Sequence, residues 1–302
     1  MKIKPGMTVV NSPAAITTKI INTEGGVELR GLSHFSLADC LTCGQAFRWQ
    51  PNGTGFSGVA LGRAVYAEQK GDTLQLAGIG EDEAFAFIRY FDLERDYGAI
   101  KKLYAHDEYL KRGMAYTPGM RVLRQPPFET LISFIISANN NVKRISGIID
   151  TVCTRYGEPL PGGRDFPSPQ TLAALTEAEL KSCGAGYRAR YIIEASRMVA
   201  EGFNLIAVGA LPYEEARREL TKLQGVGQKV ADCVALYGMG YTQSFPADVW
   251  MRRVLCNMYG YRGKNDKDMR TFVDERFGEH AGIAQQYLFH YARNHPEAFR
   301  AC

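Results

Sequence analysis

A lysine that directly follows a glycine-rich turn is the residue whose position most favours chemistry. In the stretch "LQGVGQKVADC", Gly225 and Gly227 can adopt positive φ and permit a tight turn between two helices, which leaves Lys229 at the start of the second helix. The positive end of the helix dipole disfavours an ammonium group there. Because only the neutral amine is a nucleophile, Lys229 is placed to attack a sugar C1′ or a carbonyl and form a Schiff base. A solvated lysine on an ordinary helix-turn-helix is the alternative.

A carboxylate follows nineteen residues later, in "SFPADVWMRRVL". Pro246 interrupts the chain, and Asp248 stands at the expected start of the next helix. Aspartate is a favoured N-cap, and capping alone would explain it. A carboxylate that faces Lys229 would also stabilise positive charge on a deoxyribose and help to move protons. The two interpretations are compatible.

The turn itself is suited to a phosphate group. The first amides of a helix lack internal acceptors and carry the positive end of its dipole, so Gly225, Val226 and Gly227 can bind the phosphate of a nucleic-acid backbone. Short Gly-x-Gly patterns are common, and a structural turn explains this one equally well. Cys233 follows Lys229 by four residues and therefore lies on the same helix face.

The composition is that of an ordinary globular chain of about two domains. The chain has 302 residues, of which 45% are hydrophobic, enough for a substantial core. Its net charge is +4, and the excess lies in the later part: residues 1–120 carry 13 basic and 13 acidic side chains, and residues 121–302 carry 23 and 19. This asymmetry permits a polyanionic partner without requiring one.

Seven cysteines are scattered along the chain, and no signal peptide or long apolar run accompanies them. This pattern favours a reduced, intracellular protein with no membrane association. Cys40 and Cys43 form a CxxC motif, but no second pair or nearby histidine completes a four-ligand zinc shell. We therefore expect no metal and no other cofactor. The compartment would be the cytoplasm of a bacterium or the nucleus of a eukaryote.

Two parts of the chain must position these residues, and they differ in the spacing of their hydrophobic residues. Up to about Ala77, short alternating runs are separated by glycine and asparagine, which predicts a β-rich domain with an antiparallel sheet. From Glu81 onward the period is helical, interrupted by a Pro/Gly-rich loop, "GEPLPGGRDFPSP". The predicted fold class is α+β, with a β-rich domain at residues 1–115 packed on an all-helical core at residues 116–302. The helix-hairpin-helix lies at about residues 214–237.

The hairpin with its lysine, "LQGVGQKVADC", followed by "PADVWM", resembles the helix-hairpin-helix DNA glycosylase superfamily. Lys229 matches the catalytic lysine of that superfamily, and Asp248 matches its catalytic aspartate. From about residue 35 to residue 290, "GQAFRW", "SFIISANNNVKRISG", "GYRARYI" and "GIAQQYLF" are similar, in order and spacing, to the eukaryotic-type 8-oxoguanine DNA glycosylases, which are also abasic-site lyases. The resemblance implies that the protein flips the oxidised base out of double-stranded DNA, displaces it with lysine and cleaves the strand by β-elimination. We expect a monomer.

The resemblance also implies a lesion pocket. Gly44 matches the glycine whose carbonyl accepts a hydrogen bond from N7–H, a proton that 8-oxoguanine has and guanine lacks. Cys233 and Phe289 match the residues that sandwich the flipped base, and Gln285 matches the one that hydrogen-bonds its Watson–Crick edge. A buried acceptor left unpaired costs about 1 to 3 kcal/mol, so the Gly44 contact can govern substrate choice. Without the resemblance, Gly44 would be a turn residue, and Cys233 and Phe289 would be core.

A second set of residues matches those that read the cytosine left unpaired. Asn139, Arg144 and Arg188 stand where the family contacts this cytosine, and Tyr187 stands where it wedges into the gap left by the flipped base. These residues predict a preference for cytosine opposite the lesion. Without the resemblance, Asn139 would begin a loop or cap between helices, and Arg188 would be a solvated surface residue.

Three positions depart from the family pattern or add to it. Gln224 replaces a proline often found before the first hairpin glycine, which matters little because the glycines remain. Trp250 stands where the animal enzymes have a histidine that contacts a phosphate, and its role is left open. Lys143 adds a basic group beside Arg144 that can approach the DNA backbone.

Three alternatives remain to be weighed. A related endonuclease for oxidised pyrimidines would carry a four-cysteine iron–sulfur cluster after the aspartate, but only Cys256 and Cys302 follow Asp248. A monofunctional adenine glycosylase would lack the lysine at position 229. A non-catalytic DNA-binding module would use the hairpin only to hold phosphates, and would have no need to combine Lys229, Asp248 and a base pocket.

Overall fold

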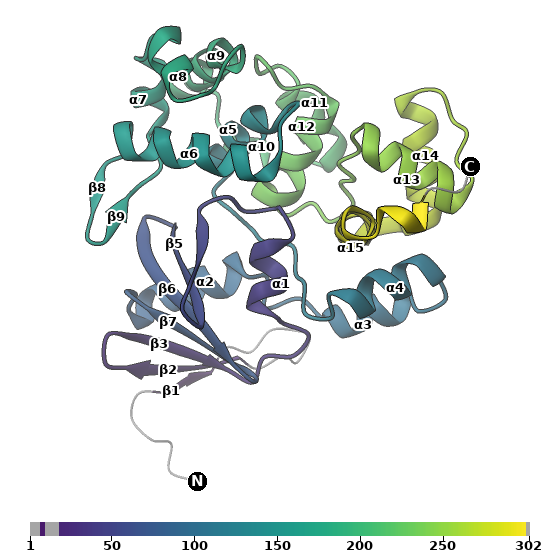
Figure 1. The fold of residues 1–302 in the computed structure, drawn as a ribbon, viewed down its shortest axis with the longest axis horizontal. Helices are drawn as coiled ribbons and strands as arrows, with labels where there is room; N and C mark the ends of the chain where they lie inside the picture. Colours follow the sequence, from purple (N-terminus) through teal and green to yellow (C-terminus); the bar gives the residue numbers. More distant parts are fainter. Residues whose placement is uncertain (1–6, 10–17, 300–302) are drawn as a thin grey trace.

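The N-terminal part of the chain forms an antiparallel sheet. In this computed structural model the structure describes residues 7–9 and 18–299, so the part of the predicted β-rich stretch at residues 10–17 lies outside the described residues. Figure 1 shows the strands gathered below most of the helices. The seven strands are ordered β1-β2-β3-β7-β6-β5-β4. They are β1 (Met7–Val9), β2 (Lys19–Thr23), β3 (Gly26–Arg30), β4 (Trp49–Asn52), β5 (Gly55–Ala60), β6 (Arg63–Lys70) and β7 (Thr73–Ala77).

Alternating side chains give this sheet one buried face. Leu29 in β3 and Leu76 in β7 are fully buried, while the residues next to each of them in sequence are more exposed. The buried face packs in a core with helices α1 (Leu37–Thr42) and α2 (Glu81–Tyr90). The predicted β-rich, antiparallel domain is confirmed.

The helical segment that begins at Glu81 is divided into three helices. Beyond α2, Asp92 has a φ of +50°, which no α-helix accommodates. The Asp96 side chain then caps α3 (Tyr97–Leu103), and the Asp107 side chain caps α4 (Glu108–Tyr116). Aspartate side chains accept hydrogen bonds from the free amides of a helix start, so they favour new helices over one continuous helix.

The remainder of the chain is a helical core, as predicted. Tyr97 of α3 and Leu110 of α4 are buried in this core rather than with the sheet, and the boundary at residue 115 remains a prediction. The loop predicted before α7 contains a short hairpin, β8 (Pro159–Leu160) and β9 (Gly163–Arg164). The remaining helices are α5 (Pro127–Ser137), α6 (Val142–Tyr156), α7 (Pro169–Ala173), α8 (Glu177–Ser182), α9 (Arg188–Ala200), α10 (Leu205–Val208), α11 (Tyr213–Leu220), α12 (Gln228–Cys233), α13 (Val249–Tyr259), α14 (Asp266–Phe277) and α15 (Ala281–Asn294).

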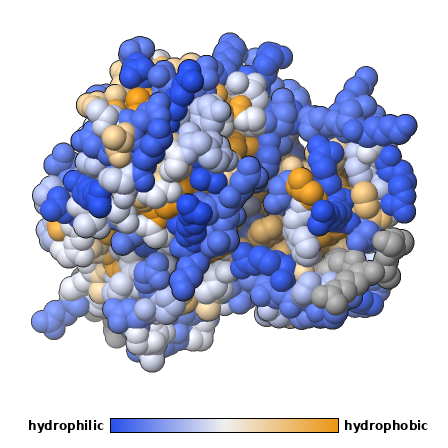
Figure 2. Space-filling model, turned by 45° about the horizontal axis from the view of Figure 1, so that its top comes forward, coloured by the Kyte–Doolittle hydropathy of each residue, from blue (hydrophilic) through white to orange (hydrophobic). Residues whose placement is uncertain are grey.

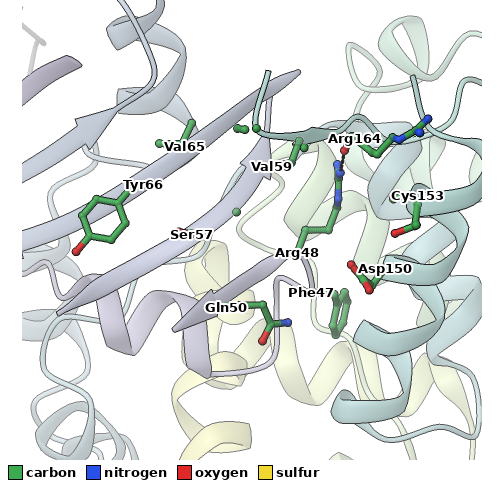
Figure 3. Close-up of a pocket in the computed structure, with 15 residues that line it drawn as sticks. Phe47, Arg48, Gln50, Ser57, Val59, Val65, Tyr66, Asp150, Cys153 and Arg164 are labelled. Carbon is green, nitrogen blue, oxygen red and sulfur yellow. Dashed lines mark hydrogen bonds between the residues drawn. The ribbon is translucent and has the colours of Figure 1, made fainter. Parts of the chain in front are cut away.

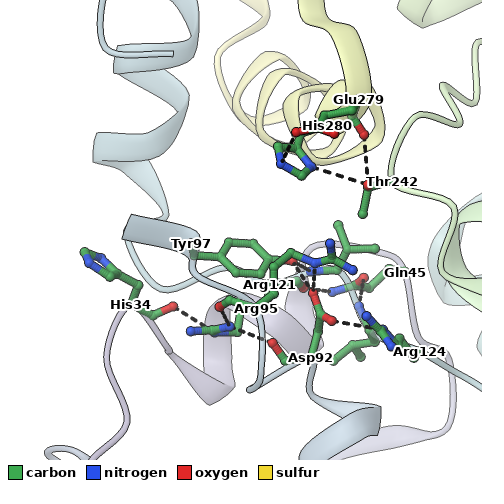
Figure 4. A network of polar contacts seen from close by, with 12 residues as sticks. His34, Gln45, Asp92, Arg95, Tyr97, Arg121, Arg124, Thr242, Glu279 and His280 are labelled. Atoms are coloured by element: carbon green, nitrogen blue, oxygen red, sulfur yellow. Dashed lines mark hydrogen bonds and ion pairs between the residues drawn. The ribbon is translucent and has the colours of Figure 1, made fainter. Parts of the chain in front are cut away.

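A buried arginine ties the sheet domain to the helical core (Figure 4). Arg121 is only 1% exposed, and its guanidinium carbon lies 4.4 Å from the centre of the Tyr97 ring. Gln45 donates to the Arg121 carbonyl at 2.7 Å and accepts from the Leu123 amide at 2.9 Å. These contacts fix the loop that carries Gly44. The guanidinium of Arg121 donates to four main-chain carbonyls, those of Ser33, His34, Asp92 and Arg95.

Candidate active site

The hairpin between α11 and α12 has the tight turn that the sequence predicts. Gly225 has a φ of +78°, and a Cβ at this position would lie 2.5 Å from the Cβ of Tyr191, so only glycine fits. Gly227 differs from the expectation, because its φ of −84° is open to other residues. It serves instead as the N-cap of α12, and Val226 between the glycines is buried against the core.

Lys229 lies in the first turn of α12, as predicted, and is held by α5. Its Nζ donates to Ser137 Oγ at 3.2 Å and lies 5.1 Å from the centre of the Phe134 ring. The Ser137 hydroxyl donates its own hydrogen to the Phe134 carbonyl at 2.7 Å. Ser137 Oγ therefore acts as an acceptor towards Lys229, which fixes the amine at one wall of a cavity.

Asp248 is the N-cap of α13, so its predicted structural role is confirmed. Its Oδ1 accepts a hydrogen bond from the Met251 amide at 2.8 Å. The side chain is nevertheless exposed and lines the same cavity as Lys229. One carboxylate can therefore both cap the helix and present negative charge to the cavity.

This cavity has a volume of about 480 Å³. Figure 2 shows that the surface is mostly hydrophilic and is hollowed between two bulkier parts of the molecule. Segments distant in the sequence meet in the cavity: the Gly44 loop, α5, α6, α12, α13 and α15. The cavity brings together all six residues predicted for catalysis and for the base pocket, Gly44, Cys233, Asp248, Gln285, Phe289 and Lys229.

Gly44 and Gln285 are the two lining residues whose local geometry bears most directly on ligand binding. Gly44 has a φ of +89°, and a Cβ there would lie 2.9 Å from Nη1 of Arg293. Gln285 is 3% exposed, and its Oε1 has no hydrogen-bond partner within the described part of the chain. Because buried polar atoms are nearly always paired, an unpaired Oε1 in the wall of a cavity indicates a position for an external donor.

Cys233 lies on the same wall as Lys229, one helical turn further along α12. Burial raises the pKa of the Cys233 thiol to about 11, although the neighbouring Lys229 opposes this shift. The thiol is therefore neutral at pH 7, and its chemistry is that of a small apolar contact rather than a nucleophile.

Several residues around the lysine were not predicted from the sequence. The ring of Tyr237 stacks on Phe134 with 5.2 Å between centroids, and its hydroxyl donates to Gln286 Oε1 at 2.6 Å. Gln286 Nε2 in turn donates to the Cys43 carbonyl at 3.2 Å. These contacts connect the support of Lys229 to the loop before Gly44. Tyr237 lies in a π-helical turn, Val234–Gly238, which no sequence pattern indicated.

Three of the four residues predicted to read the opposite cytosine or to wedge into the duplex lie together. Asn139 Nδ2 is 3.4 Å from the Tyr187 hydroxyl, and the Arg188 guanidinium carbon lies 4.5 Å from the centre of the Tyr187 ring. Tyr187 is 55% exposed, as a wedge requires. Arg188 is buried rather than solvated and donates to the Ala138 and Asn139 carbonyls. Arg144 is exposed in the first turn of α6 and does not line the cavity.

Trp250 lies in the first turn of α13, half-buried against the helical core. Its Nε1 is buried and makes no hydrogen bond to any residue that the structure describes. The described residues give this N–H no partner, and the role of Trp250 stays open.

A second cavity of about 520 Å³ lies between strands β5 and β6, helix α6 and the β8–β9 hairpin (Figure 3). Its central charge, Arg48, pairs with Glu129 at 3.4 Å and donates to the Arg164 carbonyl. Burial raises the pKa of the Cys153 thiol to about 12, so this cysteine is not a nucleophile at pH 7. The cavity contains neither a lysine nor an unpaired buried polar side chain among the described residues.

No helix between residues 18 and 299 is long and apolar enough to span a membrane. Within the same described part, no cluster of three or more His, Cys, Asp or Glu side chains is arranged to bind a metal ion.

Two family models match consecutive parts of the chain. Residues 30–131 match the N-terminal domain of 8-oxoguanine DNA glycosylase, and residues 132–278 match the HhH-GPD superfamily of base excision DNA repair proteins. A probable N-glycosylase/DNA lyase of Methanothermobacter thermautotrophicus is 35% identical over 69% of this chain and 73% of its own length. The N-glycosylase/DNA lyase of Saccharomyces cerevisiae is 29% identical over 85% of this chain and 83% of its own.

A solved structure extends the similarity to the whole fold. It is that of the 8-oxoguanine glycosylase/lyase of Clostridium acetobutylicum, in complex with double-stranded DNA containing cytosine opposite 8-oxoguanine. The two structures superpose with a TM-score of 0.88 and 36% identity, covering 92% of this chain and 98% of the other.

Proposed function

The chain belongs to the HhH-GPD superfamily of base excision DNA repair proteins, in its 8-oxoguanine DNA glycosylase branch, and we propose that it excises 8-oxoguanine opposite cytosine from duplex DNA and then cleaves the abasic strand. One observation carries this proposal. A lysine, a carboxylate and an unpaired amide oxygen, contributed by α12, α13 and α15, line one cavity. This combination provides a nucleophile, a stabilising charge and a base reader.

Lys229 is the nucleophile of the proposed reaction. Its amine lone pair forms a bond to C1′ of the flipped nucleotide, while the electron pair of the glycosidic bond leaves with the base. The attached nitrogen loses a proton, and the C1′–O4′ bond of the sugar then breaks as O4′ takes up a proton, which opens the ring and leaves a Schiff base at C1′. The Schiff base acidifies the sugar C2′–H, and β-elimination then breaks the bond to the 3′ phosphate. The hydrogen bond to Ser137 Oγ at 3.2 Å restrains the amine, which lowers the entropic cost of reaching C1′.

Asp248 stabilises the positive charge that develops on the deoxyribose as the base departs. A carboxylate held rigidly needs no reorganisation at the moment of reaction, which makes its electrostatic contribution large. The hydrogen bond from the Met251 amide provides this rigidity, since it holds one oxygen of a carboxylate that lines the cavity.

The flipped base occupies the cavity between Cys233 and Phe289. Gly44 accepts from its N7–H through the main-chain carbonyl, and Gln285 pairs with the Watson–Crick edge. The unpaired, 3% exposed Oε1 of Gln285 supports this assignment, because N1–H or the 2-amino group of the base would supply the missing donor.

The orphaned cytosine lies outside the cavity, against Asn139 and Arg188, with Tyr187 wedged into the duplex. Arg188 then exchanges some of its hydrogen bonds to main-chain carbonyls for the cytosine. Arg144 joins them from the exposed first turn of α6, and the amides of the turn from Gly225 to Gly227 hold a DNA phosphate. We propose that a single chain carries out the reaction.

A cleavage assay tests the proposal. Duplexes that contain 8-oxoguanine opposite each of the four bases are incubated with the wild-type protein, with and without borohydride. We expect strand cleavage and a trapped covalent complex, with the fastest excision opposite cytosine. If the protein binds these duplexes but yields neither product, it is a DNA-binding module and not an enzyme. Equal rates opposite all four bases would contradict the roles given to Asn139, Arg144 and Arg188.

A further inference from the structure

Arg293 lines the cavity that holds Lys229, called the lesion cavity from here on, as Lys143 also does. It has no role in the mechanism above. It lies on α15, four residues after Phe289 and eight after Gln285, so all three side chains share one helix face. Its guanidinium carbon is 5.6 Å from the centre of the Phe289 ring. Its Nη1 lies 2.9 Å from the position that a Cβ on Gly44 would take. Arg293 therefore stands where the stacking residue and the N7 reader meet.

The guanidinium of Arg293 has no anionic partner within the described part of the chain. The ion pairs of α14 involve Asp266, Arg270 and Arg276, whereas the Arg293 guanidinium packs on the face of an aromatic ring. The side chain is exposed to the solvent and lines the cavity. An unpaired guanidinium held on a ring at a cavity wall has donors free for an acceptor on the ligand.

The orientation of the base identifies that acceptor, and this step rests on the proposed function. Gln285 and Arg293 lie about 12 Å apart along the helix axis, on opposite sides of Phe289. A purine that stacks on Phe289 with its Watson–Crick edge at Gln285 directs its imidazole ring towards Arg293. Gly44 binds N7–H, and the neighbouring ring atom, C8, carries the oxygen that defines the lesion. O8 therefore faces the guanidinium.

We propose that Arg293 donates a hydrogen bond to O8 of the flipped oxopurine and stabilises the base as it leaves. When the C1′–N9 bond breaks, its electron pair passes to the base and is shared between N9 and O8. The proton released by the attacking amine neutralises N9, and Arg293 keeps its own protons. The contact is strongest while O8 carries negative charge, so it favours the transition state over the bound substrate.

Arg293 is thus a specificity-determining residue for purines with a carbonyl at C8. Guanine has a hydrogen at C8 and offers no acceptor in this place. Its N7 would meet the lone pairs of the Gly44 carbonyl, so two adjacent contacts would be lost together. The Gly44 carbonyl therefore recognises N7–H of the lesion, and Arg293 recognises O8 on the neighbouring ring atom.

The test compares Arg293→Leu with the wild type under single-turnover conditions. Three duplex substrates are used, each opposite cytosine: 8-oxoguanine, 8-thioguanine and a preformed abasic site. Arg293→Leu should slow excision of 8-oxoguanine by about tenfold. The loss should be smaller for 8-thioguanine, because sulfur is a weaker acceptor, and the abasic site, which lacks O8, should be cleaved at the wild-type rate. Binding to a non-hydrolysable 2′-fluoro 8-oxoguanine duplex should weaken much less than the rate falls.

Two control variants separate this contact from a general effect of charge. Lys143→Leu removes another cation that lines the cavity, from α6, and should change the 8-oxoguanine and abasic-site rates by the same factor. Arg293→Lys keeps a charged donor and should recover part of the rate lost in Arg293→Leu.

Each other outcome overturns the inference. Equal losses on 8-oxoguanine and 8-thioguanine would place Arg293 at O6 instead, and an equal loss on the abasic site would place it at a phosphate. An unchanged 8-oxoguanine rate would mean that Arg293 only packs on Phe289. A wild-type protein without activity on 8-oxoguanine would instead reject the proposed function, before any variant is compared.

Discussion

Two cavities of this protein are similar in volume and opposite in chemistry. The lesion cavity measures about 480 Å³ and the cavity beside the sheet about 520 Å³. In the first, Gln285 Oε1 is buried without a partner, and Arg293 has no carboxylate to pair with in the described part of the chain. In the second, Arg48 is paired with Glu129 and the Arg164 carbonyl. Unsatisfied polar groups, rather than volume, distinguish a reactive site from a packing gap.

Shifted pKa values do not distinguish the two cavities. Burial raises the pKa of the Cys233 thiol in the lesion cavity to about 11, and it also raises the pKa of Glu129, the ion-pair partner of Arg48 beside the second cavity, to about 7. Titratable groups with shifted pKa values often mark active sites, but ion pairs that stabilise a fold show the same shift. The comparison teaches that a shifted group indicates a site only when a nucleophile or an unpaired reader lies beside it.

The largest expected effect comes from the nucleophile of the lesion cavity. Lys229→Gln should reduce excision by at least about 1000-fold and abolish borohydride trapping, because an amide nitrogen is not a nucleophile. Affinity for a duplex with 8-oxoguanine should stay within a few-fold of the wild type, measured by fluorescence anisotropy. A trapped complex in this variant would show that the cavity has been assigned to the wrong chemistry.

The next effect separates the two roles of Asp248. Asn caps helices as well as Asp does, so Asp248→Asn should retain the N-cap and the melting temperature while removing the charge. We expect excision to slow by about 100-fold. Asp248→Ala is the matched variant, which should be slow and also less stable by about 1 kcal/mol. If Asp248→Asn excises at the wild-type rate, the carboxylate is only a cap.

A substitution of Gln285 tests whether its unpaired side-chain oxygen contacts the base in the lesion cavity. Gln285→Leu should slow excision of 8-oxoguanine by about tenfold, because the Watson–Crick edge of the base loses its partner. Its unfolding free energy should not fall, since the substitution removes a buried oxygen that has no partner in the described part of the chain. Cleavage of an abasic site serves as the control and should be unchanged. A marked loss of stability, measured by urea unfolding, would mean that this oxygen has a partner in solution.

The smallest effect on activity is expected at Glu129, which pairs with Arg48 beside the second cavity. Glu129→Gln should leave excision unchanged. The folded-state pKa of Glu129 is raised from 4.5 to about 7, so the folded protein retains this proton over a range in which the unfolded chain has released it. The wild-type unfolding free energy should therefore fall as pH rises from about 4.5 to 7, by at most about 3 kcal/mol. Urea unfolding of Glu129→Gln across this range should lack that part of the slope. Lost activity in this variant would contradict the contrast between the cavities.

The sequence predicts those parts of the site that obey local rules. Asp248 follows a proline and begins a helix, and Lys229 follows a glycine N-cap, so short-range capping patterns locate both residues that are proposed as catalytic. The aspartates that divide α2, α3 and α4 carry the same signal, and attention to it would have predicted the breaks. Main-chain conformation near each of these residues is decided by neighbours within four positions.

The remaining parts depend on packing between distant segments. Tyr237 reaches Phe134 from a π-helical turn, which shifts the helical phase that the periodicity assumes. Arg293 approaches Gly44 across 249 residues of sequence, and no spacing rule connects the two. The resemblance brought Gly44 and Gln285 into one hypothesis, but it did not indicate Ser137 or Arg293, which only the packing of the helices identifies.

The hydrogen bond from Gln286 to the Cys43 carbonyl closes a loop of 243 residues. A contact between residues so far apart in sequence forms late in folding, because the chain loses the entropy of closing this long loop before the contact can stabilise the fold. The Gly44 loop is synthesised long before α15, the helix that carries Gln285 and Phe289. The hairpin shares one buried core with α15, so it too depends on this helix for its packing. A chain interrupted before α15 would keep Lys229 but lose both residues proposed to stack on and read the base, together with part of the core that supports the hairpin.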